Sequence, residues 1–162
     1  MGIGKSDLKN IMEKHDLRPS KSLGQNFVVD PNTILKIVRA ANIEKGEQIL
    51  EIGPGLGSLT SQLSVNSKVV AIELDRYLVP ALEETLSHFG QSENVEIIQE
   101  DAMKIDWQEF FAQREGVWKM VANLPYNIAT PLLVTLLENA PEIQAIYVIV
   151  QLEVGERFAA SP

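Results

Sequence analysis

The amino-acid sequence predicts an α/β fold built on a mostly parallel sheet with helices on both faces. Short strand-like runs alternate with helical patterns along the 162 residues, which is the order that a parallel sheet requires. The first two runs are almost continuously apolar, as expected for strands that are covered on both faces. Hydrophobic residues make up 45% of the chain, so it has enough apolar material for the core of one domain.

The N-terminal part of the chain is predicted to be helical. Residues 6–17 read as a separate helix, and residues 18–27, rich in Ser, Gly and Lys, read as a loop. Asp30 followed by Pro31 predicts the start of a second helix, because Asp caps open amides and Pro fits the first helical position. One apolar stripe follows at helical spacing: Ile34, Leu35, Val38 and Ala41.

Five segments then read as strands: 47–53, 68–74, 95–99, 117–122 and 145–151. Helices are expected in the gaps. Residues 76–89 are amphipathic, and Thr130 followed by Pro131 repeats the capping device before a Leu-rich stripe. Residues 152–160 begin a last helix. Because a crossover helix normally leads to another strand, we expect the domain to be truncated before its last strands.

The composition excludes several classes of site. The chain has no Cys, so it forms no disulfide, thiol nucleophile or thiolate metal site. His15 and His88 lie far apart and read as surface residues, so no metal site is predicted. No apolar run approaches the roughly 20 residues that span a membrane, and no signal-peptide core is present. We therefore expect a cytoplasmic protein with no membrane partner.

Charge is unevenly distributed along the chain. The net charge of -8 argues against a nucleic-acid partner. Residues 1–45 nevertheless carry eight Lys and Arg against five acids, whereas the remainder carries six against seventeen. A basic face would therefore be N-terminal. An ordinary solvated helix surface is the alternative interpretation.

A glycine-rich turn follows the first strand. Gly53, Gly55 and Gly57 permit a tight turn and let a ligand approach the backbone. Their spacing differs from the Gly-x-Gly-x-x-Gly of nicotinamide enzymes, and no phosphate-binding Gly-Lys-Ser/Thr follows. Glu51 just before the turn would repel a pyrophosphate but attract an ammonium or a sulfonium. The turn therefore favours a cationic cofactor, with a purely structural turn as the alternative.

Polar residues also end the next three strands. Glu73 stands where α/β nucleotide sites place a carboxylate on the ribose hydroxyls. Asp101 with Ala102, after the third strand, is suited to an adenine amine and ring, and Asn123 ends the fourth strand. Each acid alone could be a solvated loop residue or a helix cap. Together they predict one ligand site at the carboxyl edge of the sheet.

The tetrapeptide Asn123-Leu124-Pro125-Tyr126 predicts handling of the exocyclic amine of a flat base. Such an amine is a poor nucleophile, because its lone pair is delocalised into the ring. The Asn123 side-chain oxygen and the Leu124 carbonyl are placed to accept its protons, while Tyr126 stacks on the base. Pro125 fixes the turn between them. A plain strand-ending turn is the alternative.

These motifs resemble class I S-adenosylmethionine-dependent methyltransferases, and more narrowly the ribosomal RNA adenine dimethyltransferase family. The resemblance covers nearly everything after residue 18 and is carried by residues 22–27 (Ser-Leu-Gly-Gln-Asn-Phe), 51–57, 73–75, 100–102, 123–127 and 150–151. It implies a Rossmann-like fold with S-adenosylmethionine as cofactor. It also implies methylation of the N6 amine of two adjacent adenosines near the 3′ end of small-subunit (16S) ribosomal RNA, within the immature small subunit during ribosome biogenesis.

The resemblance also implies a role for individual residues. Those expected at the cofactor are Asn26 and the backbone of Val28 from the N-terminal loop, Gly53 and Gly55 at the methionine part, Glu73 at the ribose, and Asp101 with Ala102 at the adenine. The expected catalytic residues are Asn123, Leu124 and Tyr126, and Asn123 faces the cofactor as well. Residues 1–21 would form a helix and basic loop, and residues 22–162 the methyltransferase domain.

The chain departs from the family pattern in two ways. The family's helical C-terminal domain and further strands lie beyond Pro162, and Gly155 stands where the family commonly has Ala. We therefore expect a monomeric fragment that binds the cofactor without methylating RNA by itself. Three other functions stay open: a ribosome-assembly factor with methylation secondary, a large-subunit RNA methyltransferase of the antibiotic-resistance type, and a nicotinamide-dependent oxidoreductase.

Overall fold

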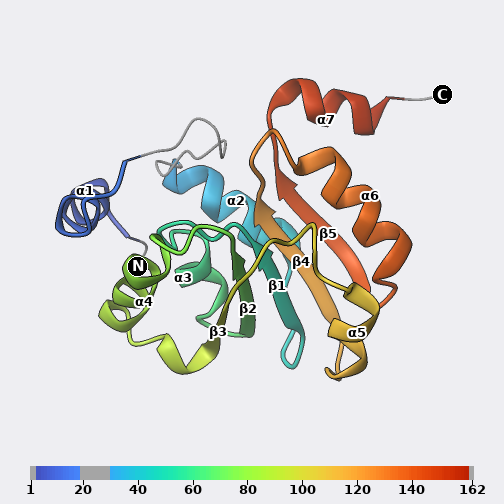
Figure 1. Cartoon of the computed structure of the whole chain (residues 1–162), viewed down its shortest axis with the longest axis horizontal. Helices are drawn as coiled ribbons and strands as arrows, with labels where there is room; N and C mark the ends of the chain where they lie inside the picture. Colours follow the sequence, from blue (N-terminus) through green and yellow to red (C-terminus); the bar gives the residue numbers. More distant parts are fainter. Residues whose placement is uncertain (1–2, 19–29, 161–162) are drawn as a thin grey trace.

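A five-stranded parallel sheet forms the centre of the computed structural model, which describes residues 3–18 and 30–160 (Figure 1). The strands are β1 (Gln48–Ile52), β2 (Lys68–Glu73), β3 (Val95–Gln99), β4 (Trp118–Asn123) and β5 (Ile143–Ile149). Their order across the sheet is β3-β2-β1-β4-β5, and every neighbouring pair is parallel. The predicted parallel α/β fold is confirmed. The fifth strand begins two residues earlier than the pattern predicted.

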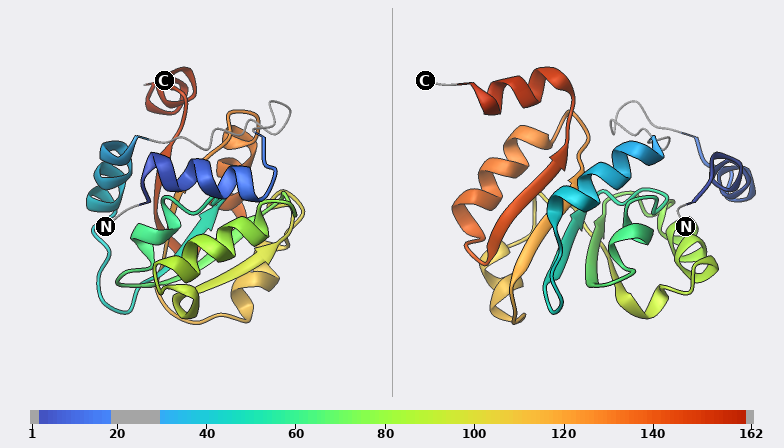
Figure 2. Two further views of the ribbon diagram at one scale, coloured as in Figure 1. Left: turned by 90° about the vertical axis from the view of Figure 1, so that its left-hand side faces the viewer. Right: turned by 180° about the vertical axis from the view of Figure 1, so that it is seen from behind.

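Helices cover both faces of this sheet, because strand side chains alternate between two apolar clusters (Figure 2). On one face, α2 (Pro31–Ala41) and α3 (Thr60–Leu63) pack over Ile49, Val69 and Val121. On the other, α5 (Trp107–Ala112) and α6 (Ala129–Asn139) pack over Leu50, Ile72 and Met120. The chain continues into α7 (Leu152–Ala159), and a short 3-10 turn, η1 (Ser92–Asn94), precedes β3.

Two helix starts show how far capping patterns predict local structure. Asp30 caps α2 as predicted, since its carboxylate accepts from the Thr33 amide at 3.0 Å. The prediction for α6 is wrong: Thr130 is not its cap, because the helix begins at Ala129. The Pro125 carbonyl accepts from the amides of Ile128 and Ala129, at 3.3 and 3.2 Å, so the preceding turn starts the helix itself.

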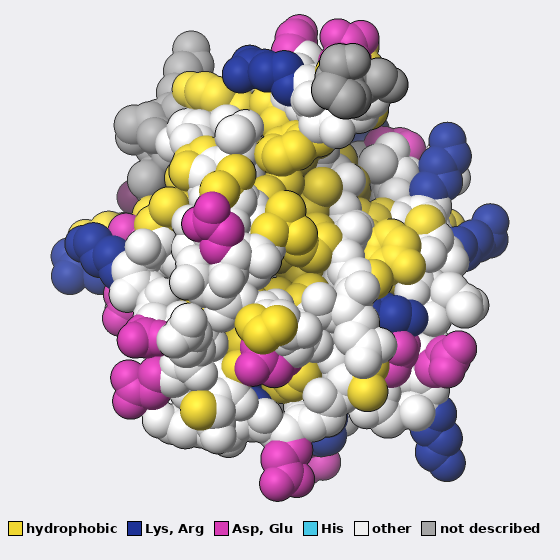
Figure 3. Space-filling model, turned by 90° about the vertical axis from the view of Figure 1, so that its right-hand side faces the viewer, with side chains coloured by type: hydrophobic (Ala, Val, Ile, Leu, Met, Phe, Trp, Pro, Cys, Tyr) yellow, Lys and Arg dark blue, Asp and Glu magenta, His cyan; other side chains and the backbone are white. Residues whose placement is uncertain are grey.

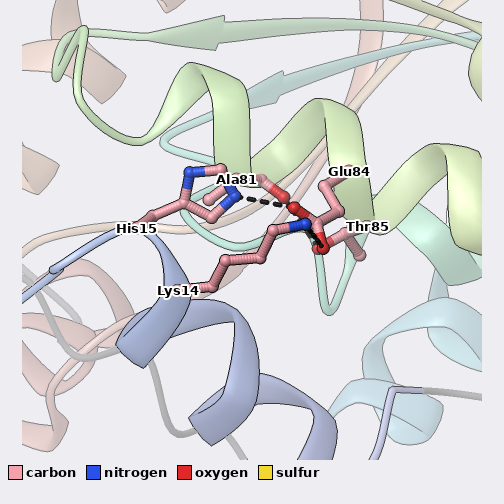
Figure 4. Close-up of polar contacts among 5 residues, drawn as sticks. All are labelled: Lys14, His15, Ala81, Glu84 and Thr85. Carbon is pink, nitrogen blue, oxygen red and sulfur yellow. Dashed lines mark hydrogen bonds and ion pairs between the residues drawn. The ribbon is translucent and has the colours of Figure 1, made fainter.

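The N-terminal helix α1 (Lys5–Lys14) lies across the outside of α4 (Val79–His88) (Figure 2). Its apolar side packs on Leu56, Leu78 and Ala81. Glu84 of α4 accepts from Lys14 at 2.9 Å and lies 2.8 Å from the ring of His15 (Figure 4). The prediction of two plain surface histidines therefore holds for His88 and is wrong for His15, which is half-buried in this contact.

Hydrophobic side chains gather on the face that carries β5, α6 and α7 (Figure 3). Exposed examples are Val134, Leu137, Leu152 and Phe158. In the described part of the chain, β5 forms one edge of the sheet and pairs with β4 alone. None of the helices in residues 3–18 and 30–160 has the length and apolar character that crossing a bilayer requires.

Candidate functional site

A cleft of about 310 Å³ opens at the carboxyl ends of the strands. The chain runs outward from β1 through β2 to β3, then returns to place β4 on the other side of β1. The crossovers therefore diverge between β1 and β4, and open parallel sheets bind ligands at such a divergence. All of its described lining residues come from the strand ends, the loops that follow them, and α2 and the adjoining helix starts.

The glycine turn after β1 forms the floor of the cleft. Gly53 has a φ of 68° and donates its amide to the Ile72 carbonyl at 2.9 Å, which ties the turn to β2. Gly57 has a φ of 84°, and a Cβ there would lie 2.7 Å from Leu82 Cδ1. Both positions therefore need glycine, and residues 53–56 of the resulting turn line the cleft.

Glu73 at the end of β2 is a buried carboxylate, only 5% exposed. Its Oε2 accepts from the Gly55 amide at 3.1 Å, and its Oε1 accepts from the Asp75 amide at 2.8 Å. Burial raises the pKa of Glu73 above its ordinary value, and these backbone hydrogen bonds work against the rise. The carboxylate thus holds the glycine turn and the loop after β2 in position while lining the cleft.

Glu51 is the most deeply buried acid of the cleft, at 1% exposure. Among the described residues, its Oε2 has no hydrogen-bond partner. Burial raises the pKa of Glu51 to about 8; the negative charge of Glu73 adds to the rise, and the Thr60 hydroxyl opposes it. An unpartnered buried carboxylate costs free energy unless a positive group comes to it. The site therefore suits a ligand that carries positive charge.

The loop after β3 contributes a second acid pair. The Asp101 carboxylate accepts from the Met103 amide at 2.9 Å, and the Asp101 amide donates to the Glu100 carboxylate at 2.9 Å. Ala102, which follows the two acids, is buried, and all three residues from 100 to 102 line the cleft. The local hydrogen bonds fix this loop, so a carboxylate and a backbone amide lie at one end of the cleft.

The loop after β4 forms the opposite end. The Leu124 amide donates to the Ile149 carbonyl at 3.0 Å, so Asn123 and Leu124 are held against β5. Pro125 Cδ lies 3.8 Å from where a Gly53 Cβ would stand, which brings this loop against the glycine turn. Tyr126 is 52% exposed at the mouth of the cleft. Its ring is therefore accessible to a flat molecule that enters from solvent.

The structure brings most of the predicted site residues together. Gly53, Gly55, Glu73, Asp101, Ala102, Asn123, Leu124 and Tyr126 all line this cleft. Asn26 and Val28, expected to close over it, lie outside the described residues. Glu51, which the sequence indicated as attractive to a cationic group but did not assign to a contact, also lines the cleft. Gln151 lines it as well, and the prediction gave it no site role.

The cleft has two chemically different ends. We call the acidic half the four carboxylates at or just after the ends of β1, β2 and β3: Glu51, Glu73, Glu100 and Asp101. We call the amide half the four neutral polar residues at or just after the ends of β4 and β5: Asn123, Tyr126, Asn127 and Gln151. Among the described lining residues there is no Lys or Arg. The arrangement therefore offers negative charge at one end and neutral hydrogen-bonding groups at the other.

Comparison with known proteins points to one family. The family model described as "Ribosomal RNA adenine dimethylase" matches residues 17–162. A Corynebacterium jeikeium protein named "Ribosomal RNA small subunit methyltransferase A" is 45% identical over 99% of this chain and 52% of its own length. The counterpart of that name in Clostridioides difficile is 44% identical over 95% of this chain and 53% of its own. The chain thus spans about half the length of the curated relatives it matches.

Solved structures agree with this result. A dimethyladenosine transferase from Plasmodium falciparum superposes with a TM-score of 0.71 at 28% identity, over 84% of this chain and 47% of that one. The 23S rRNA methyltransferase ErmE superposes with a TM-score of 0.67 at 30% identity, over 81% of this chain and 50% of that one. The predicted Rossmann-like methyltransferase fold is therefore confirmed.

Proposed function

The chain belongs to the ribosomal RNA adenine dimethylase family, and from this premise we propose that it binds S-adenosylmethionine and directs methyl groups to adenine N6 in ribosomal RNA. The proposed target is the pair of adjacent adenosines near the 3′ end of small-subunit RNA, in the immature small subunit. The observation that carries the proposal is the cleft itself, in which carboxylates that suit the cofactor face amide groups that suit the base.

The acidic half fits the cofactor group by group. S-adenosylmethionine carries an ammonium, a sulfonium, two ribose hydroxyls and an adenine. The unpartnered buried oxygen of Glu51 favours the positive groups, and the glycine turn leaves backbone room for the methionine part. Glu73 would accept from the ribose hydroxyls, and Asp101 with Ala102 would meet the adenine. Because Glu51, Glu73, Asp101 and Ala102 all line the same cleft, we propose that one extended nucleoside contacts all four.

The amide half fits the target base. The Asn123 side-chain oxygen and the Leu124 carbonyl would accept the protons of the amine, which restores electron density to its nitrogen. Tyr126 would stack on the ring after the adenine has left its own stack. When bound, the cofactor supplies a methyl carbon made electrophilic by a positive sulfur. The chain's own contribution is positioning, and no strong general base is required, because the amine can lose its proton after attack.

The N-terminal helix would add contacts to the RNA backbone. Lys5 of α1 and Arg18 beyond it are exposed. Lys9 is also exposed but pairs with Glu13 at 3.6 Å, and Lys14 pairs with Glu84 at 2.9 Å. Lys21, at the end of the predicted basic loop, lies outside the described residues. Phosphate contacts of this kind are sensitive to salt. We propose that residues 1–21 act with the domain of residues 22–162 in this way, within the cytoplasm and as a monomer.

Methyl transfer to purified particles tests the function. The 162-residue chain and the full-length gene product would each be given labelled S-adenosylmethionine with unmethylated small subunits or, separately, with large-subunit RNA. We expect the full-length product to dimethylate two adjacent adenosines of the small subunit and the chain alone to bind cofactor only. Labelling of large-subunit RNA instead would favour the second candidate, which the likeness to ErmE suggests. Labelling of neither RNA would contradict the proposal.

A further inference from the structure

We propose that Gln151 is a further substrate-positioning residue, whose side-chain amide donates a hydrogen bond to a ring nitrogen of the target adenine. This inference rests on the proposed function and adds a residue to it. Gln151 lies in the amide half of the cleft, and neither the glycine turn nor the tetrapeptide at 123–126 includes it.

Gln151 is held close to the residues that would orient the amine. Asn123 and Ile149 are partners in the register of β4 and β5, and the Leu124 amide donates to the Ile149 carbonyl at 3.0 Å. Gln151 follows Ile149 by two residues at the same carboxyl edge. The two loops therefore leave the sheet side by side, and both line the cleft.

The side chain of Gln151 is not used by the helix that it begins. Gln151 is the N-terminal cap residue of α7, but its side chain makes no capping hydrogen bond. Its backbone carbonyl instead accepts from the amides of Val154 and Gly155, each at 3.0 Å. The start of α7 thus depends on the backbone of Gln151. Its side chain is exposed and lines the cleft, so its amide is available to a ligand there.

The target base needs a donor of this kind. In the proposed arrangement, Asn123 and the Leu124 carbonyl accept the two protons of N6. The ring nitrogens beside that amine, N1 and N7, are acceptors, and Gln is a recurrent partner of the adenine edge. Glu51, Glu73 and Asp101 of the acidic half are assigned to the cofactor in this arrangement, and an ionised carboxylate cannot donate a hydrogen bond. Within the amide half, Tyr126 is assigned to the ring face, and Asn127 already has an interaction of its own. Gln151 is therefore the best-placed donor.

Base analogues test this hydrogen bond directly. Small subunits would be assembled with RNA whose 3′ segment carries adenosine, 1-deazaadenosine or 7-deazaadenosine at the target position, each analogue lacking one ring nitrogen. With normal RNA, we expect Gln151→Leu in the full-length protein to lower kcat/KM about fivefold to tenfold, the size of one hydrogen bond. We expect most of that loss in the KM for RNA, with the Kd for S-adenosylmethionine changed less than about twofold.

The decisive comparison is between variant and analogue. One of the two deaza bases should lower kcat/KM of the wild-type protein by the same factor as Gln151→Leu does. The same base should not lower kcat/KM of Gln151→Leu any further, because that variant already lacks the hydrogen bond. Glu156→Gln, on the same helix and exposed outside the cleft, is the matched control and should behave as wild type on all three RNAs. Losses that multiply in full for both deaza bases would overturn the inference.

A second variant distinguishes the loss of this hydrogen bond from a folding defect. Gln151→Glu keeps the side-chain length and the backbone cap but donates only when protonated, so its activity relative to wild type should rise as pH falls. A relative activity that is independent of pH would also count against the inference. Failure of the wild-type protein to methylate unmodified RNA would instead remove the proposed function, and this inference with it.

Discussion

The acidic half and the amide half of the cleft share one sheet edge but differ in charge, and only the acidic half contains buried polar side chains. Glu51 and Glu73 are nearly inaccessible to solvent, whereas Tyr126 is 52% exposed and Gln151 is also exposed. The difference follows the topology: β1, β2 and β3 run to one side of the divergence, and β4 and β5 lie on the other. A single sheet edge can therefore place carboxylates on one side and neutral polar groups on the other, and so bind two different ligands next to each other.

Each half suits the charge of the ligand that we propose for it. A cationic cofactor can offset the cost of burying carboxylates, so Glu51 and Glu73 can be buried. An adenine is neutral, and a charged group against it would lose hydration without a matching partner. Neutral amides and a ring near the mouth avoid that cost. Four substitutions test whether the two halves are separable, and they follow in order of expected effect.

Asn123→Ala should have the largest effect. We expect methylation by the full-length protein to fall by about a hundredfold to a thousandfold, the range seen when one preorganised polar group is removed from a reaction centre. The fold should survive, since Asn123 is only half-buried at a strand end. S-adenosylmethionine affinity should fall far less than in Glu73→Ala. Near-normal methylation by this variant would show that Asn123 does not orient the target amine. The amide half would then not be the base site that we propose.

Glu51→Gln should change how stability depends on pH. Because the pKa of Glu51 is raised from 4.5 to about 8 by burial, the folded protein holds a proton that the unfolded chain releases. Stability of the unliganded protein therefore declines as pH rises from about 5 to 8, by up to about 1.4 kcal/mol per pH unit. We expect Glu51→Gln to remove this decline, and so to gain about 2 kcal/mol relative to wild type between pH 6 and pH 8.

Urea unfolding at pH 6, 7 and 8 measures this difference. Glu156→Gln, an exposed site on α7, is the control and should follow the wild-type dependence. Wild type and Glu51→Gln declining in parallel would show that Glu51 is ionised in the folded protein. The acidic half would then already hold its negative charge without a ligand.

Glu73→Ala should weaken binding of S-adenosylmethionine at least tenfold, about 1.4 kcal/mol. The substitution removes the proposed ribose contact and also the acceptor for the amides of Gly55 and Asp75. Calorimetry with the 162-residue chain measures the affinity. Glu100→Gln, a solvent-exposed acid of the same half, provides the control and should change affinity less. An unchanged affinity in Glu73→Ala would take Glu73 out of the site.

Tyr126→Phe should have the smallest effect. If the ring acts by stacking, Phe keeps the interaction and kcat/KM for RNA should fall less than about threefold. Tyr126→Ala loses the stacking, which contributes about 1–3 kcal/mol per base in comparable sites. Steady-state methylation of small subunits by the two variants separates these cases. Equal losses in both would assign the role to the hydroxyl rather than to the ring.

Local patterns were enough to predict the sheet and the strand ends, because each signal, whether an apolar run, a glycine or a polar strand end, lies within a short stretch of sequence. Glu73, Asp101 and Asn123 were placed in this way, and all three line the cleft. Patterns of this kind gave no bounds for α5, whose six residues are too few to show a helical period. Its aromatic rings form a packed cluster with Trp118 that only the fold brings together.

Long-range contacts account for the rest of what the sequence did not predict. The contact of His15 with Glu84 joins residues 69 positions apart. The start of α6 at Ala129 depends on a turn carbonyl, which no side chain signals. The burial of Glu51, whose Oε2 has no hydrogen-bond partner among the described residues, results from packing around β1. Its acidity could therefore be noted in the sequence, but its raised pKa could not.

A crystal structure of the chain with S-adenosylmethionine tests the division of the cleft most directly. We expect the ribose hydroxyls to lie within hydrogen-bonding distance of Glu73 and the positive end of the ligand to lie beside Glu51. We also expect Asn123, Tyr126 and Gln151 to remain accessible to a base. A ribose that lies away from Glu73, or a ligand that fills the space before Tyr126 and Gln151, would contradict this division of the cleft.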